Sequence, residues 1–191
     1  MALIEHNGVR VAGALFLFGA IVGNGYNSLH AHLGTLPITA SHPSPLTDWS
    51  SYILFGFSAV GIGFLTLLFD KKLRKGSAIV SWKNAIGALI LLGIFYLCSA
   101  SMFLPNTLIF FVLAGGFILS VFLYDRSGYA LLAALLVAIA GTTAEVLQVY
   151  YHLYYYARPQ VMGVTYWLPL LYGLSSITTG QLARALASDG I

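Results

Sequence analysis

The sequence predicts an all-α integral membrane protein, a six-transmembrane-helix bundle with the N and C termini in the cytoplasm. Of its 191 residues, 59% are hydrophobic and only 8% are charged, whereas a soluble domain carries roughly 25% charged residues. The mean hydropathy of +0.85 agrees with this, and an aromatic content of 14% excludes a disordered chain. A membrane-spanning helix needs about 20 residues, so six would take roughly 120 and leave short loops.

Six apolar runs divide the chain, and we expect them to form a single domain over residues 1–191. They are Val9–Leu29, Ser50–Phe69, Lys83–Met102, Thr107–Leu123, Ala130–Tyr150 and Thr165–Leu186. The longest connection, Ala31–Asp48, contains three prolines and is not expected to be regular helix. The short Leu104-Pro105-Asn106 turn predicts that the third and fourth helices are antiparallel neighbours.

The basic residues predict the orientation of these helices. Eight of the nine fall on one side of the predicted spans, and only Arg158 falls on the other. The eight are Arg10, Lys71, Lys72, Arg74, Lys75, Lys83, Arg126 and Arg184. Because positive charge accumulates in cytoplasmic loops, the side that carries these eight residues, and with it both termini, is predicted to be cytoplasmic.

Aromatic and glycine residues give two further expectations. Tyrosines and tryptophans gather at the non-cytoplasmic ends of the spans, where an interfacial belt is favoured over ligand binding. They are Trp49, Tyr150, Tyr151, Tyr154, Tyr155, Tyr156, Tyr166 and Trp167. Gly19 and Gly23 form a GxxxG pair, for which close packing inside the bundle is favoured over self-association. Gly115-Gly116 leaves close packing and room for a ligand both open.

Glu145 is the one acidic side chain clearly within a predicted span. Placing a charge there costs about 2.5–3.5 kcal/mol on insertion scales, which makes Glu145 a functional candidate. A structural role is equally open, with a neutral Glu145 bonded to Gln148 or Thr142 one turn away.

No motif for metal binding or catalysis stands out. His30, His32, His42 and His152 are scattered on the non-cytoplasmic side without a zinc-binding pattern, so we expect no metal site. The single cysteine, Cys98, excludes a disulfide framework. We find no nucleophile elbow, phosphate loop or dinucleotide fingerprint, and we expect neither an enzyme nor a cofactor.

A series of positions in the second half of the chain matches one known family and keeps register with it without a gap. These positions are Gly93-Ile94, Asn106, Asp125-Arg126-Ser127, Val149-Tyr150, Tyr154, Tyr156, Pro159, Trp167-Leu168-Pro169, Gly180, Arg184 and Leu186-Ala187. Gly61, Asp70 and Leu73 fit more loosely. On these residues the chain resembles the Insig family, six-span sterol-sensing adaptors of the endoplasmic reticulum.

The resemblance implies a lipid-binding membrane protein that is not an enzyme. Insig proteins bind oxysterol against their third and fourth helices and hold partner membrane proteins. The family's partner-binding aspartate corresponds to Asp125, so the resemblance implies a partner contact at Asp125 and its neighbour Arg126.

Three departures from the family concern the expected ligand. An aromatic residue, a sterol-contacting glutamine and a pocket threonine of the family are replaced here by Leu91, Leu108 and Val112. Each change removes size or polarity, and a buried hydroxyl needs a partner. We therefore expect a diacylglycerol-like glycerolipid against these residues, with a sterol second.

Three hypotheses follow, of which an Insig-like lipid sensor or adaptor leads. Homo-oligomers through small-residue helix faces are expected, with other membrane proteins as possible partners and no nucleic acid. The alternative is a small transporter or membrane enzyme centred on Glu145, with Gln148 beside it. A partner-binding scaffold without lipid is third. The host membrane is predicted to be the cytoplasmic membrane in a prokaryote or the endoplasmic reticulum in a eukaryote.

Overall fold

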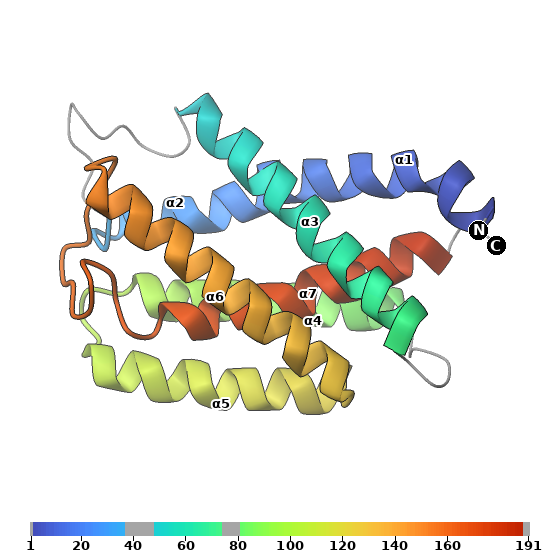
Figure 1. Ribbon diagram of the computed structural model, residues 1–191. Coiled ribbons are helices and arrows are strands. Elements are labelled where there is room, and N and C mark those ends of the chain that lie inside the picture. The colour runs from blue at the N-terminus through green and yellow to red at the C-terminus, as the bar shows by residue number, and fades with distance from the viewer. Residues whose placement is uncertain (1, 37–47, 74–80, 189–191) are drawn as a thin grey trace.

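The regular structure of the chain is helical, as predicted. A computed structural model describes residues 2–36, 48–73 and 81–188. Its helices are α1 (Ala2–Phe18), η1 (Gly19–Gly23), α2 (Asn24–His32), α3 (Trp49–Leu73), α4 (Trp82–Ala100), α5 (Asn106–Tyr124), α6 (Gly128–Tyr150) and α7 (Leu168–Ser188). Apart from an isolated bridge between Val161 and Val164, the described residues form no β-structure. The all-α fold class is confirmed (Figure 1).

The first predicted span contains a π-helical turn that the sequence did not predict. Helix α1, the π-turn η1 and helix α2 follow one another directly, and residues 8–32 are apolar enough to cross a membrane. Gly19 lies against α3 so closely that a Cβ there would stand 2.1 Å from the carbonyl oxygen of Phe55. The GxxxG glycines therefore serve close packing within the bundle, as favoured from the sequence.

Among the described residues, five helical segments have the length and apolar composition of membrane spans: Gly8–His32, α3, α4, α5 and α6. Large apolar side chains are exposed along them, among them Phe57, Ile90, Ile118 and Leu135. Without a lipid environment such a surface would aggregate. The chain is an integral, multi-pass membrane protein.

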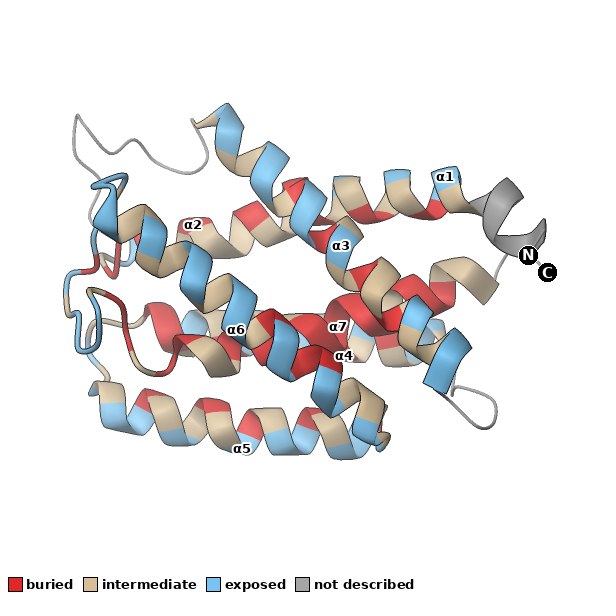
Figure 2. Ribbon diagram, in the orientation of Figure 1, coloured by how far each residue is buried: buried red, intermediate tan, exposed pale blue. Residues whose placement is uncertain are grey.

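Helix α7 is the sixth predicted span, and it differs from the others in burial. It packs against α1, α3, α4, α5 and α6, and most of its residues are buried (Figure 2). Because other helices surround it, α7 can carry buried Thr178, Gln181 and Arg184, which explains its lower hydropathy. Its 21 residues extend about 31 Å, close to the thickness of a bilayer core. That it crosses the membrane stays a prediction.

The predicted charge asymmetry corresponds to the two ends of the bundle. The first turn of α1, the last turn of α7, the end of α3 and the α5–α6 connection lie at one end (Figure 1). The described basic residues lie at this end, except Arg158; Arg74 and Lys75 are outside the described residues. Arg158 holds the α4–α5 turn at the opposite end, where its Nη2 donates to the carbonyl oxygens of Ser101 (3.2 Å) and Leu104 (3.1 Å).

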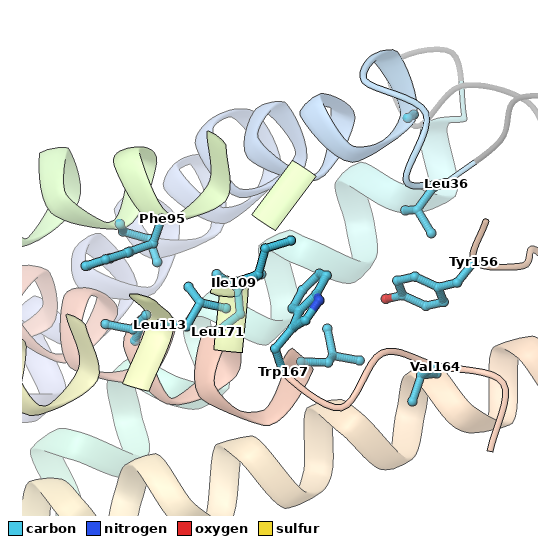
Figure 3. Close-up of a cluster of buried hydrophobic side chains, with 12 residues drawn as sticks. Leu36, Phe95, Ile109, Leu113, Tyr156, Val164, Trp167 and Leu171 are labelled. Atoms are coloured by element: carbon cyan, nitrogen blue, oxygen red, sulfur yellow. The ribbon is translucent and has the colours of Figure 1, made fainter. Parts of the chain in front are cut away.

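The main apolar core lies between α4, α5 and the start of α7 (Figure 3). Trp167 is 1% exposed at its centre, and its indole N–H donates to Asn106 Oδ1 at 3.3 Å. Tyr156 is also buried in this core. The prediction of an interfacial belt was therefore wrong for Trp167 and Tyr156, because the α6–α7 connection folds back over the end of the bundle.

The α4–α5 interface is closely packed. Phe95 of α4 fills the space beside Gly116, where a Cβ would stand 2.0 Å from the tip of the Phe95 ring. Helices α4 and α5 are neighbours joined by the short Pro105 turn, as predicted. Of the two possibilities left open for Gly115-Gly116, Gly116 provides close packing.

Candidate functional site: a cavity beside Glu145

A cavity of about 430 Å³ lies within the bundle. Its walls come from η1, α2, α3, α6 and α7, with Leu92 and Tyr96 contributed by α4. The volume falls within the roughly 300–1,000 Å³ typical of small-molecule sites. The cavity occupies the half of the bundle that the charge pattern predicts to be non-cytoplasmic.

The first half of helix α3 lines the cavity, whereas its second half packs against other helices. Residues Ser51, Leu54, Phe55, Ser58, Ala59 and Ile62 of its first half recur at helical spacing and line the cavity. In its second half, Gly63 meets Leu15 of α1 and Ala183 of α7, and Thr66 meets Gly180 of α7. The cavity therefore ends near the middle of α3, and tight helix packing follows.

The cavity surface is partly apolar and partly polar. Phe18, Leu54, Phe55 and Ile62 offer apolar contacts suited to acyl chains or a sterol ring system. Polar side chains, among them Asp48, Ser50 and Gln148, lie toward the ends of α3 and α6. Such a surface suits an amphipathic molecule, because each part of it meets a matching environment.

Glu145 is the acidic side chain of α6 that lines this cavity. Its Oε1 accepts a hydrogen bond from the Tyr172 hydroxyl at 2.7 Å, and its Oε2 accepts one from Tyr156 at 3.1 Å. These are not the predicted partners, since Gln148 donates to the carbonyl oxygen of Ala144 instead, at 3.3 Å. The sequence missed Tyr172 and Tyr156 because they lie 27 and 11 residues from Glu145 and come from α7 and the α6–α7 connection.

The Tyr156 hydroxyl stays protonated, so it remains a hydrogen-bond donor to Glu145. Burial, and next the nearby Glu145 carboxylate, raise the pKa of Tyr156 well above its ordinary value of 10.0. The phenol therefore keeps its proton across the physiological pH range.

The three residues expected to contact lipid lie elsewhere. Leu91 and Val112 pack against the main core, and Leu108 is 45% exposed on α5. None of the three is among the residues that line the cavity. Their role in lipid binding stays a prediction.

Asp125 belongs to a buried ion triad. Nη2 of Arg184 contacts Asp125 Oδ2 at 2.5 Å, while the same guanidinium holds Asp70 through Nε at 2.6 Å and Nη2 at 3.1 Å. The triad connects the end of α3, the α5–α6 connection and α7. Asp125 is only 6% exposed, so its carboxylate is directed into the protein.

Arg126 is exposed beside this triad. Its Nε donates to the Phe122 carbonyl oxygen at 2.8 Å, and its guanidinium lies 4.2 Å from the centre of the Phe122 ring. Of the two candidates for a partner contact, Arg126 is the one that a partner can reach directly.

The histidines do not form a metal-binding cluster within the described part of the chain. His30 is buried, shares a 2.9 Å hydrogen bond with Ser99 and stacks on Tyr96. Nδ1 of His32 lies 2.8 Å from the Ser28 carbonyl oxygen. His42 is outside the described residues. His30 is a core side chain that joins α2 to α4.

The fold and the cavity together define a helical membrane protein with an amphipathic internal site, and its architecture has solved counterparts. A mycobacterial Insig homolog, MvINS from Mycobacterium vanbaalenii, superposes with a TM-score of 0.80 at 22% identity, over 94% of this chain and 95% of that chain. A cross-linked MvINS trimer gives a TM-score of 0.79 at 23% identity, over the same shares. Neither family models nor curated proteins give a sequence match. The Insig resemblance is thus confirmed at the level of the fold.

Proposed function

We propose that this chain is a non-enzymatic, Insig-like membrane protein that binds one lipid in the cavity beside Glu145. The observation that supports the proposal is the cavity itself, which lies between membrane-spanning helices and combines apolar and polar lining side chains. A diacylglycerol-like glycerolipid suits it best, because its acyl chains match Phe18, Phe55 and Ile62 while its hydroxyl can meet the polar side chains. A sterol is the second candidate.

The test is to measure lipid in the purified protein. The full chain, extracted in mild detergent, is expected to carry a stoichiometric neutral lipid that mass spectrometry of an organic extract identifies. An unrelated membrane protein purified from the same cells provides the control for bulk lipid. A preparation that is folded, yet contains no lipid above that control, would contradict the proposal and favour a partner-binding scaffold.

The alternative function, a small transporter or membrane enzyme centred on Glu145, gains support only from the position of that carboxylate on the cavity wall. A transporter also requires a path to the other face, but the second half of α3 packs tightly on α1 and α7. We therefore place lipid binding first. A substrate flux or turnover that Glu145→Gln abolishes, with the fold intact, would reverse this order.

Copies of the chain and other membrane proteins are the proposed macromolecular partners. The crystallised trimer of MvINS supports self-association of this fold. For other partners, we propose that Asp125 acts indirectly by holding the α5–α6 connection, while Arg126 offers the contact. The cytoplasmic membrane of a prokaryote, or the endoplasmic reticulum of a eukaryote, is the proposed location.

A further inference from the structure

Within the described part of the chain, Glu145 faces the cavity without an ion-pair partner. It accepts hydrogen bonds from the two tyrosine hydroxyls, and the described residues that line the cavity include no lysine, arginine or histidine. His30 lines a small adjoining pocket with Glu145 and shares its hydrogen bond with Ser99. A second carboxylate, Asp48, also lines the cavity. Asp125 provides the contrast, since its carboxylate is bound to the Arg184 guanidinium.

The hydrogen-bond inventory of the cluster leaves acceptors for a ligand. A carboxylate has about four acceptor positions, and Tyr172 and Tyr156 occupy one on each oxygen of Glu145. Each phenol hydroxyl has a single hydrogen, and it donates that hydrogen to Glu145. The cluster can therefore accept further hydrogen bonds, but Tyr172 and Tyr156 have none left to donate.

The negative charge of Glu145 on the cavity wall also favours a ligand that donates hydrogen bonds over one that is itself negatively charged. A fully ionised phosphate ester has only acceptor oxygens and carries negative charge, so at Glu145 it would meet another acceptor and a like charge. In a membrane interior of low dielectric such repulsion is strong. A hydroxyl or an ammonium instead brings the donor that the carboxylate lacks.

We propose that Glu145, positioned by Tyr172 and Tyr156, is the subsite for the polar end of the ligand and selects an uncharged hydroxyl or an ammonium over a phosphate ester. This inference rests on the proposed function, lipid binding in the cavity. Glu145 lies five residues before the end of α6, about 7.5 Å along the helix axis. The polar end of the ligand then lies toward the C-terminal end of α6, with the acyl chains toward Phe18 and Ile62.

The test compares three lipids with identical acyl chains: a diacylglycerol, its phosphatidic acid, and an analogue with an ammonium in place of the hydroxyl. Each is titrated into the delipidated full chain in detergent, and bound lipid is counted by native mass spectrometry. The unmodified chain is expected to bind the hydroxyl and ammonium lipids at least about tenfold more tightly than phosphatidic acid, a difference of about 1.4 kcal/mol.

Glu145→Gln removes the charge and keeps one acceptor oxygen. It is expected to weaken the ammonium lipid most, to change the hydroxyl lipid little, and to reduce the discrimination against phosphatidic acid. Thr142→Val is the matched control, a change of similar shape one turn away at a side chain that does not line the cavity. If Glu145→Gln does not fold, Tyr172→Phe, which removes the donor to Oε1, is expected to shift the same preferences less far.

Two results would overturn the subsite and leave lipid binding intact. One is a folded Glu145→Gln variant with the preferences of the unmodified chain, and the other is tighter binding of phosphatidic acid by the unmodified chain. Failure of the unmodified chain to bind any of the three lipids would instead reject the proposed function itself.

Discussion

The bundle has a filled side and a hollow side, and α7 borders both. On the filled side, between α4, α5 and α7, Phe95 occupies the space beside Gly116. On the hollow side, between α2, α3, α6 and α7, small residues such as Ser58 and Ala144 face a cavity. Small residues in these membrane helices therefore leave a cavity only where no large side chain from the facing helix fills the space beside them.

The largest expected effect comes from breaking the ion triad that ties α7 to the end of α3. Arg184→Met removes the guanidinium that contacts buried Asp125 and partly buried Asp70, which is expected to reduce the free energy of unfolding by about 3–5 kcal/mol. Thermal or denaturant unfolding in detergent measures this loss. Arg184→Lys, which keeps the charge but not the bidentate geometry, is expected to lose less. Equal stability of Arg184→Met and the unmodified chain would show that the triad does not hold these helices together.

The filled side is expected to resist added volume. Gly116→Ala places a methyl group against the Phe95 ring and is expected to cost about 1–3 kcal/mol, because helices α4 and α5 must separate. Gly115→Ala is the matched control, since no atom lies within 4 Å of a Cβ at that position. Combining Gly116→Ala with Phe95→Leu should recover part of the loss. If both alanine variants unfold alike, the α4–α5 interface is not filled as described.

The polar cluster of the hollow side is expected to contribute least to stability. Tyr172→Phe removes the donor of the 2.7 Å bond to Glu145 Oε1, which is expected to cost about 0.5–1.5 kcal/mol. Bound lipid should reduce this cost, because a ligand donor can take the place of the lost hydroxyl. Unfolding measured before and after delipidation compares the two cases. A loss as large as that from Arg184→Met would instead make the cluster a structural element.

The sequence predicted the helices well and the cavity poorly, for a physical reason. Spans follow from apolar runs, so the predicted boundaries lie within a few residues of α3 to α7. The π-turn at Gly19–Gly23 and the burial of Trp167 depend on packing against distant segments, which local composition does not encode. Glu145 stands out in the sequence because a carboxylate in a span is costly, whereas Tyr156 is assigned to the interfacial belt and nothing in the sequence singles out Tyr172.

The site expected from the family resemblance and the cavity found in the structure differ in place. Leu91 and Val112 pack on the filled side and Leu108 is exposed on α5, while the cavity lies between α2, α3, α6 and α7. The signal for the cavity was present in the sequence as a stripe of small and hydroxyl residues on α3, including Ser51, Ser58 and Ala59. Only the partner helices reveal that this stripe faces open space.

Filling each side of the bundle in turn shows whether lipid occupies the hollow side. Ala144→Trp adds a large side chain on the cavity wall, and Leu108→Trp adds one at the exposed surface of α5. Lipid extracted from each purified variant is counted per polypeptide by mass spectrometry. We expect loss of the lipid from Ala144→Trp and full retention in Leu108→Trp. Retention in Ala144→Trp with loss from Leu108→Trp would contradict this expectation and place the lipid against α5.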